Sequence, residues 1–231
     1  FLFLSTWRDF CRMSVFKLSS IQTISSFIYE FSMMRCSHAI HLFGLLAFLY
    51  CFTALSQAAD FSQFRGKSGK AINTQSDLPM KWSDNSNLIW RAEIEGRGSS
   101  SPIVVGEKVL LTAYSGYGNL NQTGRQEKLI RQLLCFDLKD GKQLWKATIE
   151  NKQREDVYQG FITEHGYATS TPVSDGESVF VFFGKSGVLA FDLEGKQKWH
   201  VSVGIESAQR RWGSAPSLVL HKDTVIVNAS D

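Results

Sequence analysis

Cysteine is scarce in this sequence, and its placement matters more than its number. The 231 residues include four cysteines, of which Cys11, Cys36 and Cys51 precede residue 60. Cys135 is therefore the one cysteine in the remainder of the sequence. A single cysteine can form neither an internal disulfide nor a cysteine-based metal site. The part after residue 60 must depend on its hydrophobic core for stability.

An excess of charge of one sign is also lacking. Lys and Arg number 25 against 22 Asp and Glu, and the net charge of +3 comes without a dense basic stripe. Nucleic-acid-binding surfaces normally show clustered basic residues, so no nucleic-acid partner is expected. Proline, at four residues, is too rare for a disordered linker. The sequence contains no Ser/His/Asp triad, phosphate loop or zinc motif, and it singles out no catalytic residue and no metal ligand.

Long hydrophobic runs are missing too. The run Ile40–Leu55 covers roughly 16 residues, whereas a membrane-spanning helix needs roughly 20. It follows Arg35 and precedes the small residues at 56–58, which is the order found in a secretory signal. We therefore predict a signal peptide over residues 34–59. The alternative interpretation of the run is a membrane anchor.

Cleavage of this signal would leave a mature chain that starts at Ala59 or Asp60. We then expect an exported protein, periplasmic or secreted, with no stable membrane span. The sequence begins with Phe1 rather than Met, and residues 1–33 mix Phe, Ser and Ile without a clear period. We interpret residues 1–33 as a non-native upstream or fragment segment, and residues 60–231 as the folded part.

Three segments of the folded part resemble one another. Residues 99–112, 169–183 and 213–227 each contain a short apolar stretch, a tight polar turn and a second apolar stretch. This pattern predicts a β-hairpin in each segment. A proline stands near the start of each first strand, where its missing N–H disturbs the strand pairing least.

A second strand–turn–strand module follows each of the first two hairpins. Leu134–Leu138 leads through a glycine-containing turn to Trp145, and Leu189–Leu193 leads in the same way to Trp199. The residues after each Trp alternate between apolar and polar, as in a half-buried strand. Hairpin and module together predict a unit of four antiparallel strands.

The spacing of the units is that of a β-propeller. Pro172 and Pro216 are about 44 residues apart, the usual length of one blade. A four-stranded sheet cannot bury both of its faces alone, but blades stacked around an axis bury them, with large aromatic residues between neighbours. The longer spacing from Pro102 is explained by polar loop insertions over 115–131 and 150–165. The sequence therefore predicts an all-β fold, a partial β-propeller of four-stranded antiparallel blades.

Alternation of apolar and polar residues over Trp90–Ile94 predicts one further outer strand ahead of the first hairpin. The inner strands of its blade are not found in the sequence, and the hairpin over 213–227 ends in mid-blade. We expect about two full blades plus partial blades, truncated before ring closure. Unpaired edges and uncovered apolar faces would make such a chain marginally stable and prone to association.

The modules also resemble a known repeat. Residues 135–145 follow the pattern A-x-D-x-x-T-G-x-x-x-W of the PQQ-like (pyrrolo-quinoline quinone) repeat, with Cys135 in place of Ala and Asp140 in place of Thr. Residues 190–199 are similar, with a turn one residue shorter. The segment Phe61–Gly66 resembles secreted, planctomycete-type members of this β-propeller family, most of which have no assigned activity. The resemblance implies a propeller of seven or eight blades.

The recurring residues of the modules are expected to pack rather than to react, because a packing role recurs in every blade and a catalytic site occurs once. They are Asp137, Gly141, Trp145, Asp192, Gly195 and Trp199. Quinoprotein dehydrogenases similar to this family hold PQQ with Ca²⁺, which needs several converging oxygen ligands. No acidic cluster and no adjacent cysteine pair can be singled out here, so no cofactor is expected. PQQ with calcium is the alternative.

Binding residues are sought just before the hairpins, where blade loops open onto one face. The candidates are His165, Tyr167, Arg210, Arg211 and Trp212. Among them, Arg211 and Trp212 are the candidates for a binding face; the alternative is a surface Arg pair and an inter-blade Trp. We predict an exported, non-catalytic scaffold for an unknown protein or extracellular ligand. The alternative function is that of a PQQ-dependent quinoprotein oxidoreductase, a dehydrogenase.

Overall fold

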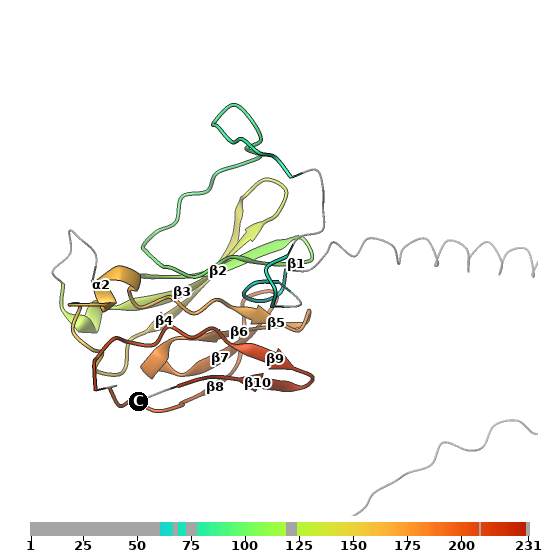
Figure 1. Cartoon of the computed structure of the whole chain (residues 1–231). Coiled ribbons are helices and arrows are strands. Elements are labelled where there is room, and N and C mark those ends of the chain that lie inside the picture. Colours follow the sequence, from blue (N-terminus) through green and yellow to red (C-terminus); the bar gives the residue numbers. More distant parts are fainter. Residues whose placement is uncertain (1–60, 67–68, 73–77, 119–123, 208, 230–231) are drawn as a thin grey trace, which may run out of the picture. The chain divides into compact units, whose positions relative to one another are not determined.

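The described part of the chain is shown in Figure 1, a computed structural model, and consists of residues 61–66, 69–72, 78–118, 124–207 and 209–229. Every described residue belongs to one compact unit, Gln57–Asp231. The upstream segment and the signal peptide predicted over 1–59 lie outside the described residues. In the part that is described, no helix combines the length and the apolar composition needed to cross a bilayer.

The first sheet is one complete blade of four antiparallel strands in chain order. Its strands are β1 (Ile103–Val105), β2 (Lys108–Ser115), β3 (Ile130–Asp137) and β4 (Gln143–Glu150). Each strand pairs with the next, so that Cys135 of β3 lies opposite Leu110 on one side and Trp145 on the other. The hairpin and the module predicted for this region are thereby confirmed as one sheet.

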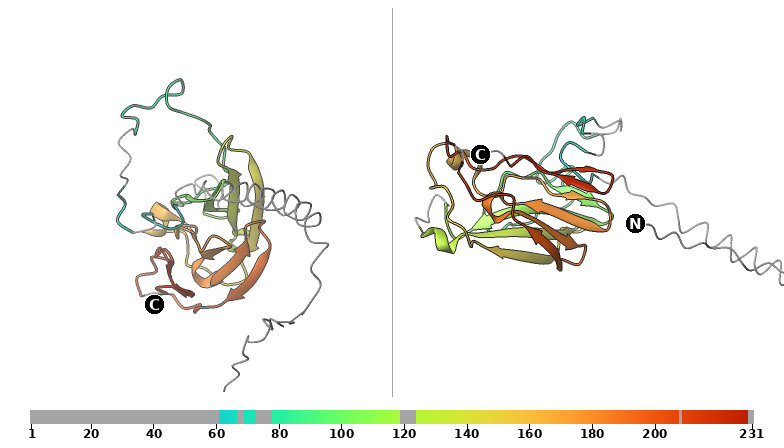
Figure 2. Two further views of the ribbon diagram at one scale, coloured as in Figure 1. Left: turned by 90° about the vertical axis from the view of Figure 1, so that its right-hand side faces the viewer. Right: turned by 90° about the horizontal axis from the view of Figure 1, so that it is seen from below.

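The second sheet repeats this arrangement, and one further hairpin follows it. Its strands are β5 (Val173–Ser174), β6 (Ser178–Phe182), β7 (Val188–Asp192) and β8 (Gln197–Val201), and the hairpin is formed by β9 (Val219–His221) and β10 (Thr224–Ile226). The helical segments are short: α2 (Ile162–His165), η1 (Gln126–Lys128) and η2 (Gly184–Ser186). The fold is therefore all-β, with partial propeller blades as predicted (Figure 2).

The repeated Asp closes the turn between the last two strands of each blade. Asp137 Oδ1 accepts hydrogen bonds from the backbone N–H groups of Lys139 and Asp140, at 2.8 and 3.3 Å. Asp192 Oδ1 accepts from the N–H groups of two residues of its own turn, at 3.1 and 2.8 Å. The strand register shifts just before each Asp, after Cys135 and after Ala190. The Asp of the repeat is thus a turn residue in both blades.

The repeated Trp and Gly form a contact between neighbouring blades. Trp145 Nε1 donates to the Leu193 carbonyl oxygen of the next blade at 2.9 Å. Gly195, in the same turn, has a φ of +86°, and a Cβ at this position would lie 2.7 Å from the Trp145 indole. Glycine is required because it tolerates this backbone conformation and leaves room for the ring. The wedge role predicted for Trp145 is confirmed.

The same contact occurs one unit earlier, between Trp90 and the first blade. Trp90 Nε1 donates to the Leu138 carbonyl oxygen at 2.8 Å, and a Cβ on Gly141 would lie 2.4 Å from its ring. In both contacts the donor lies 48 residues before the acceptor. Trp199, which is 38% exposed, packs instead on Phe180 of its own blade.

The strand predicted over Trp90–Ile94 is wrong, since these residues are irregular. Among the described residues no strand lies alongside to supply backbone partners, and alternation alone does not order a strand. Trp90 and Ala92 nevertheless pack against the apolar face formed by Val109, Leu134 and Phe136. The sequence pattern therefore identified the buried side of this segment but not its secondary structure.

The number of residues between the last two units also differs from the number that alignment of the sequence segments predicted. Thr171 donates its backbone N–H to Ser217 Oγ at 3.1 Å, across 46 residues. The equivalent contact one blade earlier runs from the Ser101 N–H to Thr171 Oγ1 at 3.0 Å, across 70 residues. The structural period between the last two units is thus 46, whereas aligning the prolines gave about 44. Pro172 and Pro216 therefore do not occupy equivalent positions in their units, because the two hairpins align by their turns and not by their prolines.

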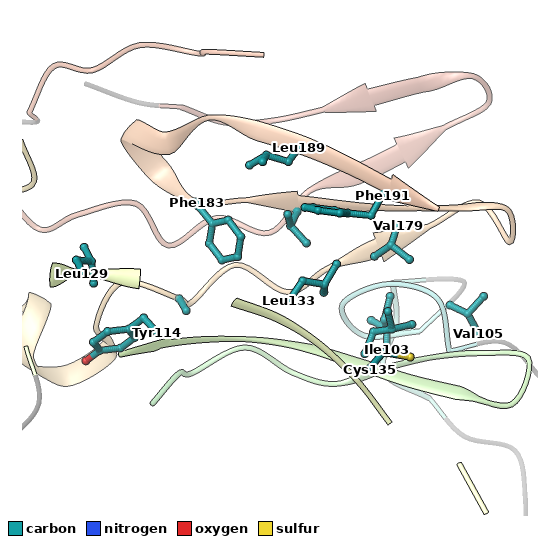
Figure 3. Close-up of a cluster of buried hydrophobic side chains, with 13 residues drawn as sticks. Ile103, Val105, Tyr114, Leu129, Leu133, Cys135, Val179, Phe183, Leu189 and Phe191 are labelled. Carbon is teal, nitrogen blue, oxygen red and sulfur yellow. The ribbon is translucent and has the colours of Figure 1, made fainter. Parts of the chain in front are cut away.

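The main core lies between the two sheets (Figure 3). Side chains alternate across β3, so Leu133 and Cys135 face the second sheet while Leu134 faces the other side. Leu189 and Phe191 from β7 belong to the same cluster as Leu133 and Cys135, and all four side chains are buried. Burial of each such leucine stabilises the fold by about 1.5–3 kcal/mol relative to an exposed one. This core holds the two blades together and positions the loops at their ends.

Candidate functional site

Strand pairing places two kinds of connection at opposite ends of the blades. Ser115, Ile130 and Glu150 are neighbours at one end of the first sheet, so the connections that follow Ser115 and Glu150 both begin there. We call this end the loop end; in the second blade, the connections that follow Phe182 and Val201 begin at the same end. The opposite end, with the tight turns at 106–107, 138–142, 175–177 and 193–196, is the turn end. Figure 2 shows the turns and the loops at opposite ends of the strands.

A buried ion pair lies at the loop end. Arg131 of β3 donates through Nη2 to Glu155 Oε1 at 2.6 Å, and the two side chains are 2% and 7% exposed. Arg131 Nη1 also donates to Ser186 Oγ of the second blade at 2.9 Å, and Nε donates to the Tyr167 carbonyl oxygen at 3.2 Å. One arginine thus holds the first blade, the loop after it and the second blade together.

A second cation of the second blade fastens the same loop. Lys185 Nζ lies 3.6 Å from Asp156 Oδ1 and donates to Ser207 Oγ at 2.7 Å. Ser207 Oγ in turn donates to Asp156 Oδ1 at 2.5 Å. This connects loop 151–161 with loop 202–217. Both carboxylates of the first loop, Glu155 and Asp156, therefore point inward and are neutralised.

Tyrosine rings surround this network. Tyr167 packs on Tyr114 edge to face and on Tyr117 and Tyr158 at tilted angles, with ring centroids 5.5–6.0 Å apart. Its hydroxyl donates to the Asp156 carbonyl oxygen at 2.7 Å. Burial raises the pKa of Tyr167, and Tyr117 and the charge of Glu155 raise it further. The cavity beside the network has a volume of about 30 Å³, room for little more than a water molecule. The interior of the loop end is therefore closely packed, and the raised pKa keeps the Tyr167 phenol protonated at neutral pH.

An arginine–aromatic patch lies on the surface of the loop end. We define this patch as Phe161, Arg210, Arg211 and Trp212. The Phe161 and Trp212 rings lie 4.7 Å apart and are 57% and 43% exposed. The Arg210 guanidinium carbon lies 4.8 Å from the centroid of the Trp212 ring, within the range of a cation–π contact. The patch borders a hollow of about 250 Å³.

The structure thus brings together four of the five predicted binding candidates. Arg210 and Trp212 lie in the patch together with Arg211, which is exposed and has a φ of +51°. His165 lies behind it, with Nε2 2.8 Å from the Trp212 carbonyl oxygen. A carbonyl oxygen only accepts, so this nitrogen donates. Tyr167 is separate, because it belongs to the buried network.

Sequence reasoning missed several residues of this end. Arg131, Glu155, Asp156 and Lys185 appeared as ordinary charges in loops. The sequence pattern assigned Arg131 to the polar insertion 115–131, whereas it lies in β3. Phe161 lies in a polar insertion, and nothing in the sequence indicates that it meets Trp212.

A larger hollow, of about 630 Å³, lies beside the inner strands. The segment after residue 60 borders it: the Phe61 carbonyl oxygen accepts from the N–H of Val104, and the Ser62 carbonyl oxygen accepts from the N–H of Ser174. Its hydroxyls include those of Thr171 and Ser217, and each already accepts a backbone N–H from the preceding blade. These hydroxyls hold blades together, and the hollow lacks a converging polar set.

The carboxylates of the described residues bear on the alternative of a PQQ–calcium site. No group of three or more His, Cys, Asp or Glu side chains converges anywhere in this part of the chain. The carboxylates of Glu155 and Asp156 are engaged by Arg131 and Lys185. Calcium needs several oxygen ligands at one point, so these residues provide no such donor set.

Four-stranded blades joined by a Trp–Gly contact define a β-propeller repeat protein. Residues 126–231 match the family model described as "Outer membrane protein assembly factor BamB". Among solved structures, BamB from Moraxella catarrhalis is similar at 13% sequence identity with a TM-score of 0.28. That match covers 55% of this chain and 40% of the Moraxella catarrhalis protein. No curated protein matches the sequence.

Proposed function

We propose that this protein is an exported, non-catalytic scaffold that binds another protein or an extracellular ligand through the loop end of its blades. The observation that supports this most directly is how the chain uses its polar residues. The recurring Asp, Gly and Trp residues serve turns and blade contacts, and the buried charges of the loop end neutralise one another. The exposed side chains of the arginine–aromatic patch are Phe, Trp and Arg, which are types enriched in protein interfaces.

The resemblance to PQQ-like repeats suggests one enzymatic alternative, a PQQ-dependent quinoprotein oxidoreductase. It is tested by incubating the purified protein with PQQ and Ca²⁺ and measuring dye-linked oxidation of alcohols and sugars. We expect no turnover above a control without protein. Turnover that requires PQQ would overturn the scaffold proposal.

Export is tested separately. The proposal expects mature material that begins at Ala59 or Asp60, found in the periplasm or the medium. Mass spectrometry of the intact protein reads this N-terminus. A retained leader in the membrane fraction would refute cleavage and would leave the proposed binding role unchanged.

A further inference from the structure

We infer that the arginine–aromatic patch binds an acidic protein segment that presents an aromatic or aliphatic side chain beside a carboxylate. This inference rests on the proposed scaffold function and specifies the chemistry of its partner. It goes beyond that function by assigning both a surface and the kind of peptide that the surface recognises.

The apolar half of the patch is the Phe161–Trp212 pair. Two large rings in contact with each other, and both about half exposed, leave apolar surface in water beside a hollow of about 250 Å³. Covering such surface is favourable, and Trp and Arg are the residue types most often found at the energetic centre of interfaces. A hollow of this volume accommodates a single apolar side chain of a partner better than a flat surface would.

The charged half follows from where the carboxylates of these loops lie. Glu155 and Asp156 are turned inward onto Arg131 and Lys185, so they do not compensate the patch. Glu164 of α2 and Glu206 of the loop 202–217 are exposed, but within the described residues neither forms an ion pair with Arg210 or Arg211. As far as the described residues go, the patch therefore presents two guanidinium groups that form no ion pair with a carboxylate.

Guanidinium groups select carboxylates by paired hydrogen bonds, and stacking on an aromatic ring leaves the N–H groups of Arg210 at its edge available. Complementary charge thus favours a partner segment with Asp or Glu next to its apolar side chain.

The patch is also held in place, which lowers the cost of binding. Its two loops are joined by the Asp156–Ser207 hydrogen bond and by Lys185, which contacts both residues. Its Trp is fixed from behind by the contact between His165 and the Trp212 carbonyl oxygen. A preformed surface of this kind spends less binding free energy on ordering its own side chains.

The test is a selection from a random dodecapeptide phage library on the purified protein, with an Arg210→Gln/Arg211→Gln variant as the counter-target. We expect the wild type to enrich peptides in which Asp or Glu adjoins Phe, Trp or Leu. The best peptide is then synthesised with a fluorophore, and its Kd is measured by anisotropy. Arg210→Gln/Arg211→Gln and Trp212→Ala should each weaken binding about tenfold or more, and 0.5 M NaCl should weaken it several-fold.

The matched control is Lys139→Gln/Lys142→Gln, which removes the same charge from the turn end and should change Kd by less than about twofold. Circular dichroism confirms that each variant remains folded. Enrichment of neutral or basic peptides, or equal binding to the arginine variant, overturns the patch assignment while leaving a scaffold function intact. Binding to phosphatidylglycerol vesicles without peptide enrichment overturns it as well. PQQ-dependent turnover, by contrast, removes the scaffold function on which the inference rests.

Discussion

The turn end and the loop end of the same blades follow different rules. At the turn end, each blade repeats the same Asp-capped turn, and the Trp of the preceding unit docks on it through the same carbonyl and glycine contact. At the loop end, within the described residues, the connection 151–172 has no counterpart of equal length, and its contacts with Arg131 and Lys185 have no equivalent in another blade. The comparison teaches that the repeat defines the architecture, while the individual character of this protein is concentrated where the repeat is interrupted.

The largest loss of stability is expected on replacing Arg131. This residue tests the division between the two ends, because it lies at the loop end and yet we expect its role to be structural. Replacing Arg131 by Ala should lower the free energy of unfolding by about 3–5 kcal/mol, since it leaves Glu155 charged, buried and without its partner. Urea unfolding of the purified protein, followed by circular dichroism, measures the change.

The control is the double variant Arg131→Met/Glu155→Leu, which removes both charges and should regain most of the lost stability. A loss below about 1 kcal/mol in Arg131→Ala would mean that the loop end contributes little to folding. The division between an architectural end and a functional end would then be complete.

Gly195 tests the turn end. Gly195→Ala places a Cβ 2.7 Å from the Trp145 ring and requires a φ of +86°. We expect a loss of about 2–4 kcal/mol, from backbone strain together with overpacking against the indole. The measurement is again urea unfolding.

Gly176→Ala is the matched control for this substitution. Its φ is +97°, and an added Cβ meets nothing within 4 Å. It should cost about 1–2 kcal/mol from strain alone. Equal losses in the two variants would show that the Trp145 contact adds nothing, and that the recurring Gly serves the turn only.

The smallest effect on stability is expected at Cys135. It allows the two blades to be compared, because Ala190 occupies the equivalent position in the second blade. Burial raises the pKa of the Cys135 thiol from 9.0 to about 11. The folded state therefore keeps the proton longer than the unfolded state does. The resulting stabilisation is complete below about pH 9 and is lost as the pH rises through about 11, with a loss of about 1 kcal/mol by pH 10.

Cys135→Ala should flatten this pH dependence, as read from unfolding midpoints at pH 8.0, 9.0 and 10.0. The pKa values of Tyr114 and Tyr167 are raised by burial too, but both variants contain these residues, so their contributions cancel. Identical slopes for the two proteins would show that the thiol is not the group that titrates.

Predictability from sequence follows the same division between the two ends. The hairpins, the turns at 138–142 and 193–196 and the docking of Trp145 follow from local pattern, because alternation and turn residues act over a few neighbours. The strand over Trp90–Ile94 failed, because a strand needs a partner that alternation cannot supply. The two-residue error in the last unit arose because the sequence alignment relied on a proline, while the turn sets the register.

The sequence by itself determined the class of fold, since a repeat of packing residues admits few architectures. It also placed Arg211 and Trp212 in a connection that opens at one end of the blades. Only the tertiary structure decided that Arg131 meets Glu155 across 24 residues and that Phe161 meets Trp212. Such contacts join loops of no fixed pattern, and their partners are selected by which side chains the packed blades bring within reach. Local propensity contains no information about that distance, so the chemistry of the loop end could be seen only once the sheets were in place.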